Sequence, residues 1–526
     1  MKISFPTCER QTLAALLIIA LAASCSSDEK SGEAKASDPS LLDASLGTGT
    51  ASATTADAGV AVVTNPTWHK DIAPLVSEKC SACHVEGGIA PFSLKSYAAA
   101  KPFATLMAQD VESGKMPPFL AQETDSCKPP LPWVEDIRLS GAQKALIRAW
   151  ADTGAPEGDP ATATALVPPS PVAIEREDLV AKLPKPITVE GNKDIHQCIV
   201  IDPLFSHDTY LVSRLITAGN SKVLHHVVSY VVQPGTVDDG AGQKRPRTKA
   251  ELEAELKKQK GVGIGDSYPC FGSPSIESPL SAELIDAWAP GGNANRAPAD
   301  SGQPIAANSL VIFDIHYHPT GGPAEVDSST KLSLMISDAK PQYVSKVILL
   351  GNFAKPSITV PYVTSSGVAD LIKQPDEAEA AFLIPANAKG HIEEMTWKWK
   401  LPTVPLKVYA MATHMHYVGR GMRIWVEHAA APAGTPATQC LIETPAWDFN
   451  WQRGYGYKTP SYDALPTLMD GDTMHFRCDY DNTLGNPYVA KALNDQGKTV
   501  PQDVPLGEDT LDEMCLGGIG IMYPNR

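Results

Sequence analysis

The sequence predicts a multidomain chain in which a small all-α domain is followed by all-β sandwich domains. Its 526 residues are too many for a single core, and about three folded units are expected at this length. Apolar residues recur at helical spacing over residues 67–79 and again over 139–150. From about Ile187 onward, short β-rich runs alternate with turn residues, and the 45 prolines and 39 glycines suit a turn-rich β protein.

The start of the chain has the pattern of an export signal. A short apolar run follows Lys2 and Arg10 and ends in small residues before Cys25. The run is too short to span a bilayer, and its end resembles a bacterial lipoprotein signal. We therefore expect residues 1–25 to be a lipoprotein signal peptide with Cys25 as the lipid anchor; an ordinary cleaved signal peptide is the alternative. Either signal predicts an exported protein. If Cys25 is the lipid anchor, it alone holds the protein to the membrane, facing the periplasm or the cell surface.

Two segments have the composition of linkers. Residues 26–66 are dominated by Ser, Ala, Asp, Gly and Thr and contain too few large apolar residues to form a core, which predicts a flexible linker. Residues 159–186 are rich in proline and predict an extended connector. The formal net charge of -16 argues against nucleic acid as a partner.

The segment 67–158 contains the motif Cys80-Ser81-Ala82-Cys83-His84. Two thiols at this spacing can form thioethers to haem while the following imidazole reaches the iron, so the motif is typical of c-type haem attachment. A redox Cys-x-x-Cys is the alternative. With helical patterns on both sides, the segment resembles a class I cytochrome c.

A methionine is expected as the second axial ligand of that haem. Met116 lies in Gly-Lys-Met-Pro-Pro, where the prolines exclude a helix, and is the favoured donor. Met107 is the competitor, but its stretch has a helical pattern in which a core role is more typical. Ligation by His84 and Met116 would leave no open position on the iron, so this domain is expected to carry electrons rather than bind substrate.

The run Met411-Ala412-Thr413-His414-Met415-His416 has two histidines at strand spacing. Alternate residues of a strand point to one face, so His414 and His416 can offer two imidazoles to one metal. Far downstream, Met514 could add a thioether. Two nitrogens and one sulfur suit Cu(I) better than Mg, Ca or Mn and leave room for an exogenous ligand such as dioxygen.

Two other apolar runs also contain histidines: His225 and His226 in one, His316 and His318 in the next. A buried imidazole costs free energy unless it is hydrogen-bonded or ligated, although each could be a satisfied structural residue. Adjacent strand residues face opposite ways, so His225 and His226 can share a metal only where the strand is twisted or bulged. His316 and His318 share a face, so spacing alone leaves the third ligand open.

Taken in order, these histidine runs and the Asp512-Glu513-Met514-Cys515 turn resemble the copper type II ascorbate-dependent monooxygenases, the family of the peptidylglycine alpha-hydroxylating enzyme and dopamine beta-hydroxylase. The resemblance covers roughly residues 190–526. It implies two jelly-roll-like sandwich domains, 187–344 and 345–526, with one copper on each and a solvent-filled cleft between them. The two implied ligand sets are His225, His226 and His316 for an electron-storing copper, and His414, His416 and Met514 for the catalytic, oxygen-binding copper.

Six cysteines remain outside the signal and the haem motif, and this even number suits an oxidising compartment. The resemblance suggests that Cys478 pairs with Cys515 and Cys198 with Cys270. Elimination then leaves Cys127 with Cys440, which would connect the haem segment to a copper domain.

The sequence departs from the peptide-hydroxylating members of this family. Their substrate carboxylate is held by Arg, Asn and Tyr side chains, and the corresponding positions here look like Ala412, Leu516 and Gly518. None of these can bind a carboxylate, so a different small organic substrate is expected. The aromatic cluster at residues 447–452 could line its pocket, although alternating aromatics are more often sandwich core.

The resemblance thus implies an exported haem- and copper-dependent monooxygenase that hydroxylates a C–H bond with O2. The haem would take electrons from a periplasmic donor and pass them to the copper of the first sandwich, replacing or supplementing an ascorbate-like reductant. One alternative is a copper and haem electron-transfer or copper-binding protein without oxygenase activity. A zinc hydrolase is less favoured, because methionine is a poor zinc ligand.

Overall fold

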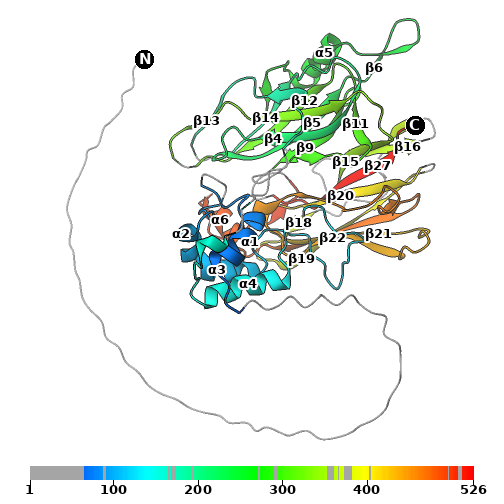
Figure 1. Ribbon diagram of the computed structural model, residues 1–526. Coiled ribbons are helices and arrows are strands. Elements are labelled where there is room, and N and C mark those ends of the chain that lie inside the picture. Colours follow the sequence, from blue (N-terminus) through cyan, green and yellow to red (C-terminus); the bar gives the residue numbers. More distant parts are fainter. Residues whose placement is uncertain are drawn as a thin grey trace, which may run out of the picture. The chain divides into compact units, whose positions relative to one another are not determined.

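The computed structural model divides the chain into two compact units, Met1–Val60 and Ala61–Arg526. All described residues belong to the second unit (Figure 1). The expected signal peptide, Cys25 and nearly all of the 26–66 linker lie outside them, as does part of the 159–186 connector. The described residues are 64–86, 90–163, 166, 173–191, 194–270, 273–288, 294–320, 322–351, 360–364, 367–371, 382–401, 404–495, 497–507 and 512–526.

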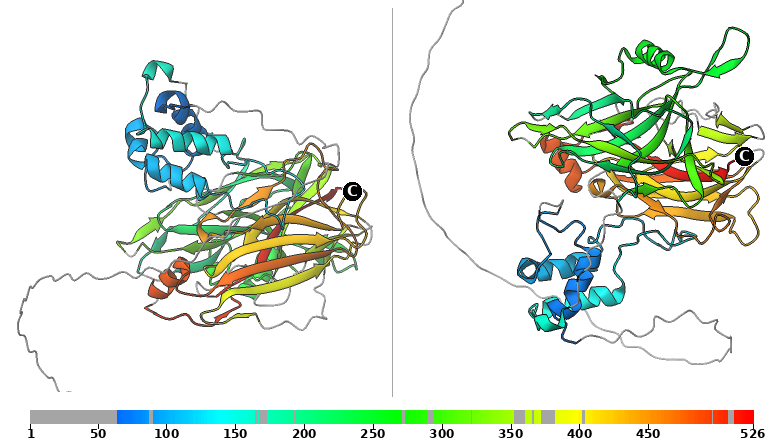
Figure 2. Two further views of the ribbon diagram at one scale, coloured as in Figure 1. Left: turned by 90° about the horizontal axis from the view of Figure 1, so that it is seen from below. Right: turned by 45° about the horizontal axis from the view of Figure 1, so that its top comes forward.

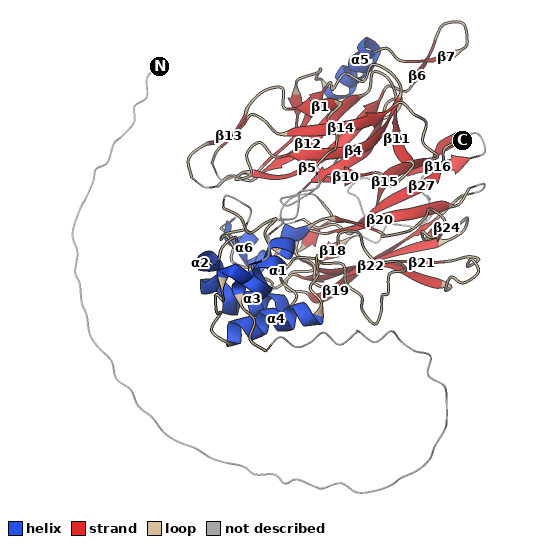
Figure 3. Ribbon diagram, viewed as in Figure 1, coloured by secondary structure: helices blue, strands red, loops and turns tan. Residues whose placement is uncertain are grey.

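Strands predominate among the described residues, and the helices are few and short (Figure 3). The β-sandwich character expected from the sequence is therefore confirmed. In the part of the chain that the structure describes, no helix is both long enough and apolar enough to cross a membrane.

The N-terminal part of this unit is helical, as its apolar periodicity predicts. Its last long helix, α4, begins after Ser140, whose hydroxyl accepts from the backbone of Gln143 while the Gln143 side chain accepts from the backbone of Ser140. The helices surround one core, in which Met107 and Trp150 are buried, so Met107 has the core role that its helical pattern predicts. The elements are η1 (Trp68–Ile72), α1 (Ala73–Lys79), α2 (Tyr97–Ala100), η2 (Lys101–Phe103), α3 (Ala104–Glu112), α4 (Gly141–Asp152) and η3 (Pro160–Thr162).

The first sandwich packs two sheets around one apolar core. One sheet has the order β8-β3-β12-β5-β9, and strands β1, β14, β4 and β11 face it across the core. Strand β12 lies at the centre of its sheet and is buried along its whole length. The strands are β1 (Leu179–Lys182), β2 (Ile187–Val189), β3 (Ile195–Ile201), β4 (Thr209–Thr217), β5 (Leu224–Gln233), β6 (Thr236–Asp238), β7 (Lys244–Pro246), β8 (Ser267–Tyr268), β9 (Ser281–Trp288), β10 (Asn295–Arg296), β11 (Ser301–Ile305), β12 (Leu310–Tyr317), β13 (Glu325–Asp327) and β14 (Lys331–Ser337).

Helix α5 (Lys249–Lys260) is a charged helix that lies among these strands in the sequence. Thr248 caps it: its hydroxyl accepts from the backbone of Glu251, and the Glu251 carboxylate accepts from the backbone of Thr248. Gly261 ends the helix in the left-handed conformation, with φ of 78°.

The second sandwich packs the sheet β19-β25-β21-β22 against strands β15, β27, β20 and β23 (Figure 2). Alternate residues of β21 and β25, such as Ile424 and Phe476, meet Met411 and Ile519 in its core. Its elements are β15 (Tyr343–Gly351), β16 (Val360–Thr364), β17 (Gly367–Leu371), β18 (Leu383–Ile384), β19 (Lys389–Lys398), β20 (Leu406–His414), β21 (Gly419–Glu427), β22 (Thr438–Thr444), η4 (Phe449–Trp451), β23 (Gly454–Gly456), β24 (Thr467–Leu468), β25 (Thr473–Asp481), α6 (Pro487–Asp495), β26 (Val504–Pro505) and β27 (Leu516–Pro524).

The two sandwiches share one long sheet. Strand β15 pairs in parallel with β11 of the first sandwich and antiparallel with β27 of the second. The expected boundary between residues 344 and 345 therefore falls inside β15, and the backbone hydrogen bonding continues across it.

The three expected cysteine pairs are within disulfide distance, and their Cα atoms are 5.2 to 5.9 Å apart. Cys478 with Cys515 joins β25 to the turn before β27, and Cys198 with Cys270 lies in the first sandwich. Among the described cysteines, Cys80 and Cys83 are the two that form no disulfide. The pairs are Cys127 with Cys440, Cys198 with Cys270, and Cys478 with Cys515.

Candidate metal centres

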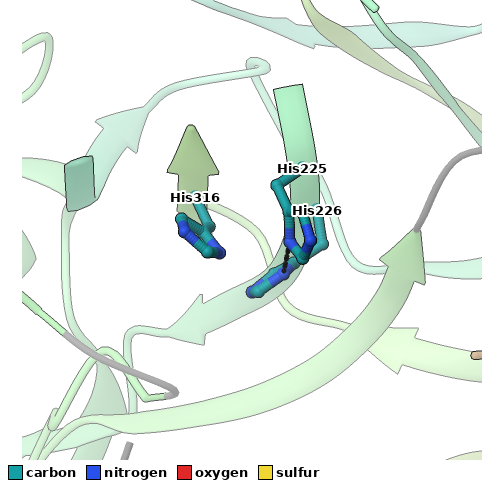
Figure 4. A group of neighbouring side chains, drawn as sticks. All are labelled: His225, His226 and His316. Atoms are coloured by element: carbon teal, nitrogen blue, oxygen red, sulfur yellow. Dashed lines mark hydrogen bonds between the residues drawn. The ribbon is translucent and has the colours of Figure 1, made fainter. Parts of the chain in front are cut away.

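The first histidine cluster is formed by a β-bulge. His316 on β12 pairs with His226 on β5, but the next residue, Tyr317, pairs with Leu224. His225 is the extra residue, so the bulge that the sequence requires for a shared metal is present. It brings the Nδ1 atoms of His225 and His226 to 3.1 Å from each other (Figure 4).

His316 completes a set of three imidazoles. One ligand nitrogen from each of His225, His226 and His316 lies within 4.8 Å of the others. The Nδ1 atom of His316 is buried and has no hydrogen-bond partner among the described residues. A buried polar atom without a partner costs free energy, and a bound metal ion would remove that cost. Burial also lowers the pKa of His225 to about 3, so its ring is neutral, as metal binding requires.

A carboxylate behind the cluster selects which nitrogen of His316 is available. The Oδ2 atom of Asp194 lies 3.0 Å from Nε2 of His316, and its Oδ1 atom lies 2.7 Å from Nδ1 of His318. Burial alone would raise the pKa of Asp194, but its hydrogen bonds with His316 and His318 hold it well below its usual range. The Nε2 atom of His316 therefore donates to Asp194, which leaves Nδ1 for a metal.

The geometry favours His316 over His318 as the third donor. His316 is buried beside His225 and His226, whereas the His318 side chain is 55% exposed and contacts Asp194. This choice could not be made from the shared strand face alone.

Sequence reasoning missed Asp194 and His196. His196 lies opposite His316 on the neighbouring strand β3, and the two rings stack with centroids 3.9 Å apart. Asp194, His196 and His316 form a second set of ligand atoms within 4.8 Å of one another. The alternation of Asp194 and His196 puts both on one side of the chain where β3 begins, but it does not show which strand they face.

The second cluster lies where β20 ends. His414 is the last residue of β20, and the rings of His414 and His416 are 5.2 Å apart. His414 pairs with Leu516 at the start of antiparallel β27, so the turn that carries Met514 lies beside His416. Met514 is 4% exposed. The structure thus places the three expected residues in one neighbourhood.

Acceptor oxygens hold the Nδ1 atoms of both histidines in this cluster. Nδ1 of His414 lies 2.6 Å from Oε1 of Gln452, and Nδ1 of His416 lies 3.0 Å from the carbonyl oxygen of Asp512. Each Nδ1 therefore carries the proton, and each Nε2 keeps its lone pair for a metal. Burial, followed by the charge of His414, lowers the pKa of His416 to about 3. Two neutral imidazoles, with Met514 on the adjoining turn, are the donor types that suit copper.

Glu513 connects the histidine turn to the methionine turn, and sequence reasoning missed it. Its carboxylate is buried and accepts from the backbone N–H groups of His416, Val418, Gly419 and Met514. Burial raises its pKa to about 8, although these hydrogen bonds oppose the shift. The disulfide from Cys515 to Cys478 fixes the same turn from the other side.

The loop 447–453, called the bridging loop below, contacts both clusters. The indole nitrogen of Trp447 donates to the carbonyl oxygen of His416 at 3.2 Å. The ring centroid of Phe449 lies 5.3 Å from that of His225 and 6.4 Å from that of His416. Trp447 is buried in the core of the second sandwich, as aromatic alternation suggests. Phe449 has its ring close to a histidine of each cluster.

The Cys-x-x-Cys-His motif follows the end of α1. The Nδ1 atom of His84 lies 3.1 Å from the carbonyl oxygen of Phe92, which leaves Nε2 as its metal-binding nitrogen. Burial raises the pKa of the Cys80 thiol to about 12. Cys80 and Met116 both pack against the helical core, so the structure gathers the motif and the expected axial methionine around one core.

Comparison with known proteins gives no family. No family model matches the chain, and no curated protein matches it. Similar solved structures include the major capsid protein P2 from bacteriophage PM2 (8% identity, 66% of this chain and 97% of that chain, TM-score 0.23). Others are the VP2 subviral particle of infectious bursal disease virus (8%, 67% and 75%, TM-score 0.15) and allantoicase (10%, 56% and 80%, TM-score 0.13). At these TM-scores they carry no argument about this chain.

Proposed function

We propose that this chain is a copper protein with two separate centres of different donor chemistry. More particularly, we propose a haem- and copper-dependent monooxygenase that resembles the copper type II ascorbate-dependent family and hydroxylates a C–H bond of a small organic substrate with O2. The observation that carries the proposal is the buried Nδ1 atom of His316, which has no hydrogen-bond partner among the described residues and belongs to a set of three converging imidazoles.

The donor sets support a division of roles. The first offers three nitrogens, from His225, His226 and His316. The second offers the nitrogens of His414 and His416, and strand pairing puts the turn that carries Met514 beside them. When bound, copper supplies one-electron redox chemistry at both and binds dioxygen at the second.

The surrounding residues would hold these donors in place. Asp194 orients His316, and Gln452 orients His414. Glu513 keeps the His416 and Met514 turns together, and Trp447 shields them from water. Preorganised ligands of this kind reduce the rearrangement that a change of copper oxidation state requires.

For the helical part we propose a class I cytochrome c-like domain. Cys80 and Cys83 would attach haem c, and His84 and Met116 would be its axial ligands. The electron source would be a periplasmic donor or an ascorbate-like reductant, and lipid attachment at Cys25 would hold the protein at the membrane surface.

The strand register supports a substrate that has no carboxylate where the peptide-hydroxylating members of the family bind one. Ala412 on β20 and Gly518 on β27 pair directly, and a Cβ atom added to Gly518 would meet the Cβ atom of Ala412 at 3.1 Å. Leu516 is buried beside them. These three residues form a small apolar surface.

Metal analysis and oxygen uptake test the proposal together. Full-length protein matured in a periplasm is expected to contain two coppers and one haem and, with a reductant and a panel of small organic compounds, to consume O2 and release hydroxylated product. The variant Met514→Leu should lose product formation, whereas Met469→Leu, on a surface turn of the same sandwich, should retain it. Two coppers and one haem without product from any compound would favour the electron-transfer alternative, and zinc in place of copper would exclude both.

A further inference from the structure

Residues 119–134, called the docking segment below, belong to the second sandwich rather than to the helical core. Phe119, Ala121 and Trp133 are buried in the same core as the β20 residues Val408 and Met411. The helices before and after this segment surround a different core. The helical part is therefore anchored through apolar burial in the second sandwich.

Covalent and polar contacts fix the docking segment on β22. Cys127 forms a disulfide with Cys440. The backbone N–H of Gln122 donates to the carbonyl oxygen of Glu443 at 2.9 Å, and the hydroxyl of Ser126 donates to the Glu443 carboxylate at 2.9 Å.

Strand β23 and the residues after it hold the other end of the segment. The backbone N–H of Val134 donates to Gly456 at 2.8 Å, and that of Lys458 donates to Pro132 at 2.7 Å. The rings of Trp133 and Tyr457 stack with centroids 4.9 Å apart. With both ends held, the segment has a defined register on the second sandwich.

A short series of contacts connects this anchor to the second histidine cluster. Phe119 is three residues beyond Met116, and the guanidinium of Arg453 lies 5.4 Å from its ring centroid. The residue before Arg453 is Gln452, whose side chain accepts from Nδ1 of His414. The charge of Arg453 also acts on the Cys-x-x-Cys motif. Burial raises the pKa of Cys83, and the positive charge of Arg453 partly opposes this shift.

We propose that the helical part delivers electrons to the site of His414, His416 and Met514, through Arg453 and Gln452 of the bridging loop, rather than to the three-histidine site. The inference rests on the proposed function. One electron leaves ferrous haem, which becomes ferric, and reduces Cu(II) at the second site to Cu(I), with no bond broken. Arg453 and Gln452 are positioning residues. The bridging loop approaches the three-histidine site through Phe449 instead, whose ring centroid lies 5.3 Å from that of His225.

Anaerobic stopped-flow spectroscopy tests which copper receives the electron. In haem- and copper-loaded full-length protein, the haem is reduced by a substoichiometric pulse of reductant and its reoxidation is followed by its visible band. The double variant His414→Ala with His416→Ala is expected to abolish the fast reoxidation, and His225→Ala with His226→Ala to keep it. The reverse pattern would overturn the proposal.

The variant Arg453→Ala tests the connection itself. Fast haem reoxidation should slow by about tenfold, as for loss of other residues that orient metal ligands, and Arg453→Lys should recover part of it. Lys458→Ala, at the same edge of the sandwich, should leave the rate unchanged. Haem content and the Cu(II) electron paramagnetic resonance spectrum show that each variant is folded and loaded. An unchanged rate in loaded Arg453→Ala would also overturn the proposal.

The two proposals fail in different ways. Protein that transfers electrons from haem to the second copper but oxidises no substrate supports this inference and contradicts the oxygenase. Protein that forms product while the haem reoxidises through the three-histidine site does the opposite.

Discussion

The two histidine clusters use the same residue type in opposite tautomers. In the first, an acceptor faces Nε2 of His316 and leaves Nδ1 for a metal; in the second, acceptors face Nδ1 of His414 and His416 and leave Nε2. In the first the acceptor is the Asp194 carboxylate. In the second the acceptors are neutral oxygens of Gln452 and of the Asp512 backbone, and the Glu513 carboxylate holds the backbone of the two turns. The hydrogen bond behind a histidine, more than its place in the sequence, therefore determines how it can bind a metal.

The largest expected effect comes from removing one donor of the first cluster, which tests whether the two clusters bind metal separately. The variant His316→Ala should lose the copper of the three-histidine site and keep the other, so that copper content falls by half. The measurement is copper per protein chain after saturation with copper and removal of the unbound metal.

His318→Ala is the matched control for that loss. It removes a histidine that also contacts Asp194 but is exposed, and it should retain both coppers. If His318→Ala lost a copper while His316→Ala did not, the assignment of the third donor would be wrong.

A stability measurement tests the backbone support of the second cluster. Glu513→Ala leaves four backbone N–H groups without their buried acceptor, which should lower the free energy of unfolding by at least about 3 kcal/mol. Urea unfolding of the copper-free protein measures it. Glu427→Ala in the same sandwich, whose side chain is 56% exposed, should change stability by less than about 0.5 kcal/mol. Equal effects of the two variants would contradict the role of Glu513.

The carboxylate support of the first cluster should be visible in metal affinity. Asp194→Asn removes the charged acceptor of the His316 Nε2 proton and should weaken copper binding there by about tenfold to a hundredfold, without affecting the second site. Competition titration with a copper chelator measures it. The control is Asp338→Asn, which alters a similar contact between Asp338 and His207, 2.7 Å long, outside both clusters. Unchanged affinity in Asp194→Asn would show that Asp194 does not orient His316.

A further prediction is a pH dependence that both clusters share. Burial lowers the pKa values of His225 and His416 to about 3 in the folded protein, against about 6.5 when unfolded. Between these values the unfolded chain binds protons that the folded chain does not, so the copper-free protein should lose stability as the pH falls from about 6.5 toward 3. Urea unfolding at several pH values measures this, and His225→Ala should flatten the dependence. An unchanged slope would mean that His225 is not buried in the neutral form.

Local features of this fold could be predicted from the sequence because they depend on neighbouring residues. Apolar periodicity predicted α4. Strand spacing predicted that the rings of His414 and His416 lie together, and they do, although His416 follows the last residue of β20. The bulge at His225 followed from the need to bring adjacent histidines together.

Features that depend on distant pairing could not be predicted. Asp194 and His196 join the first cluster only because β3 pairs with β12, more than 100 residues later. Local periodicity does not indicate that β11 pairs in parallel with β15. It also does not indicate that Trp133 is buried in the second sandwich. Glu513 was missed because a single acidic residue in a turn is ordinarily exposed.

The disulfide between Cys127 and Cys440 has a consequence for biogenesis. These cysteines are separated by 313 positions, so the closed loop contains the whole first sandwich. During synthesis Cys127 emerges long before its partner, and Phe119 and Trp133 have no apolar core to enter until the second sandwich exists. A chain arrested before residue 440 should therefore expose these aromatic side chains and the Cys127 thiol, so that folding depends on chaperones and on a thiol oxidase.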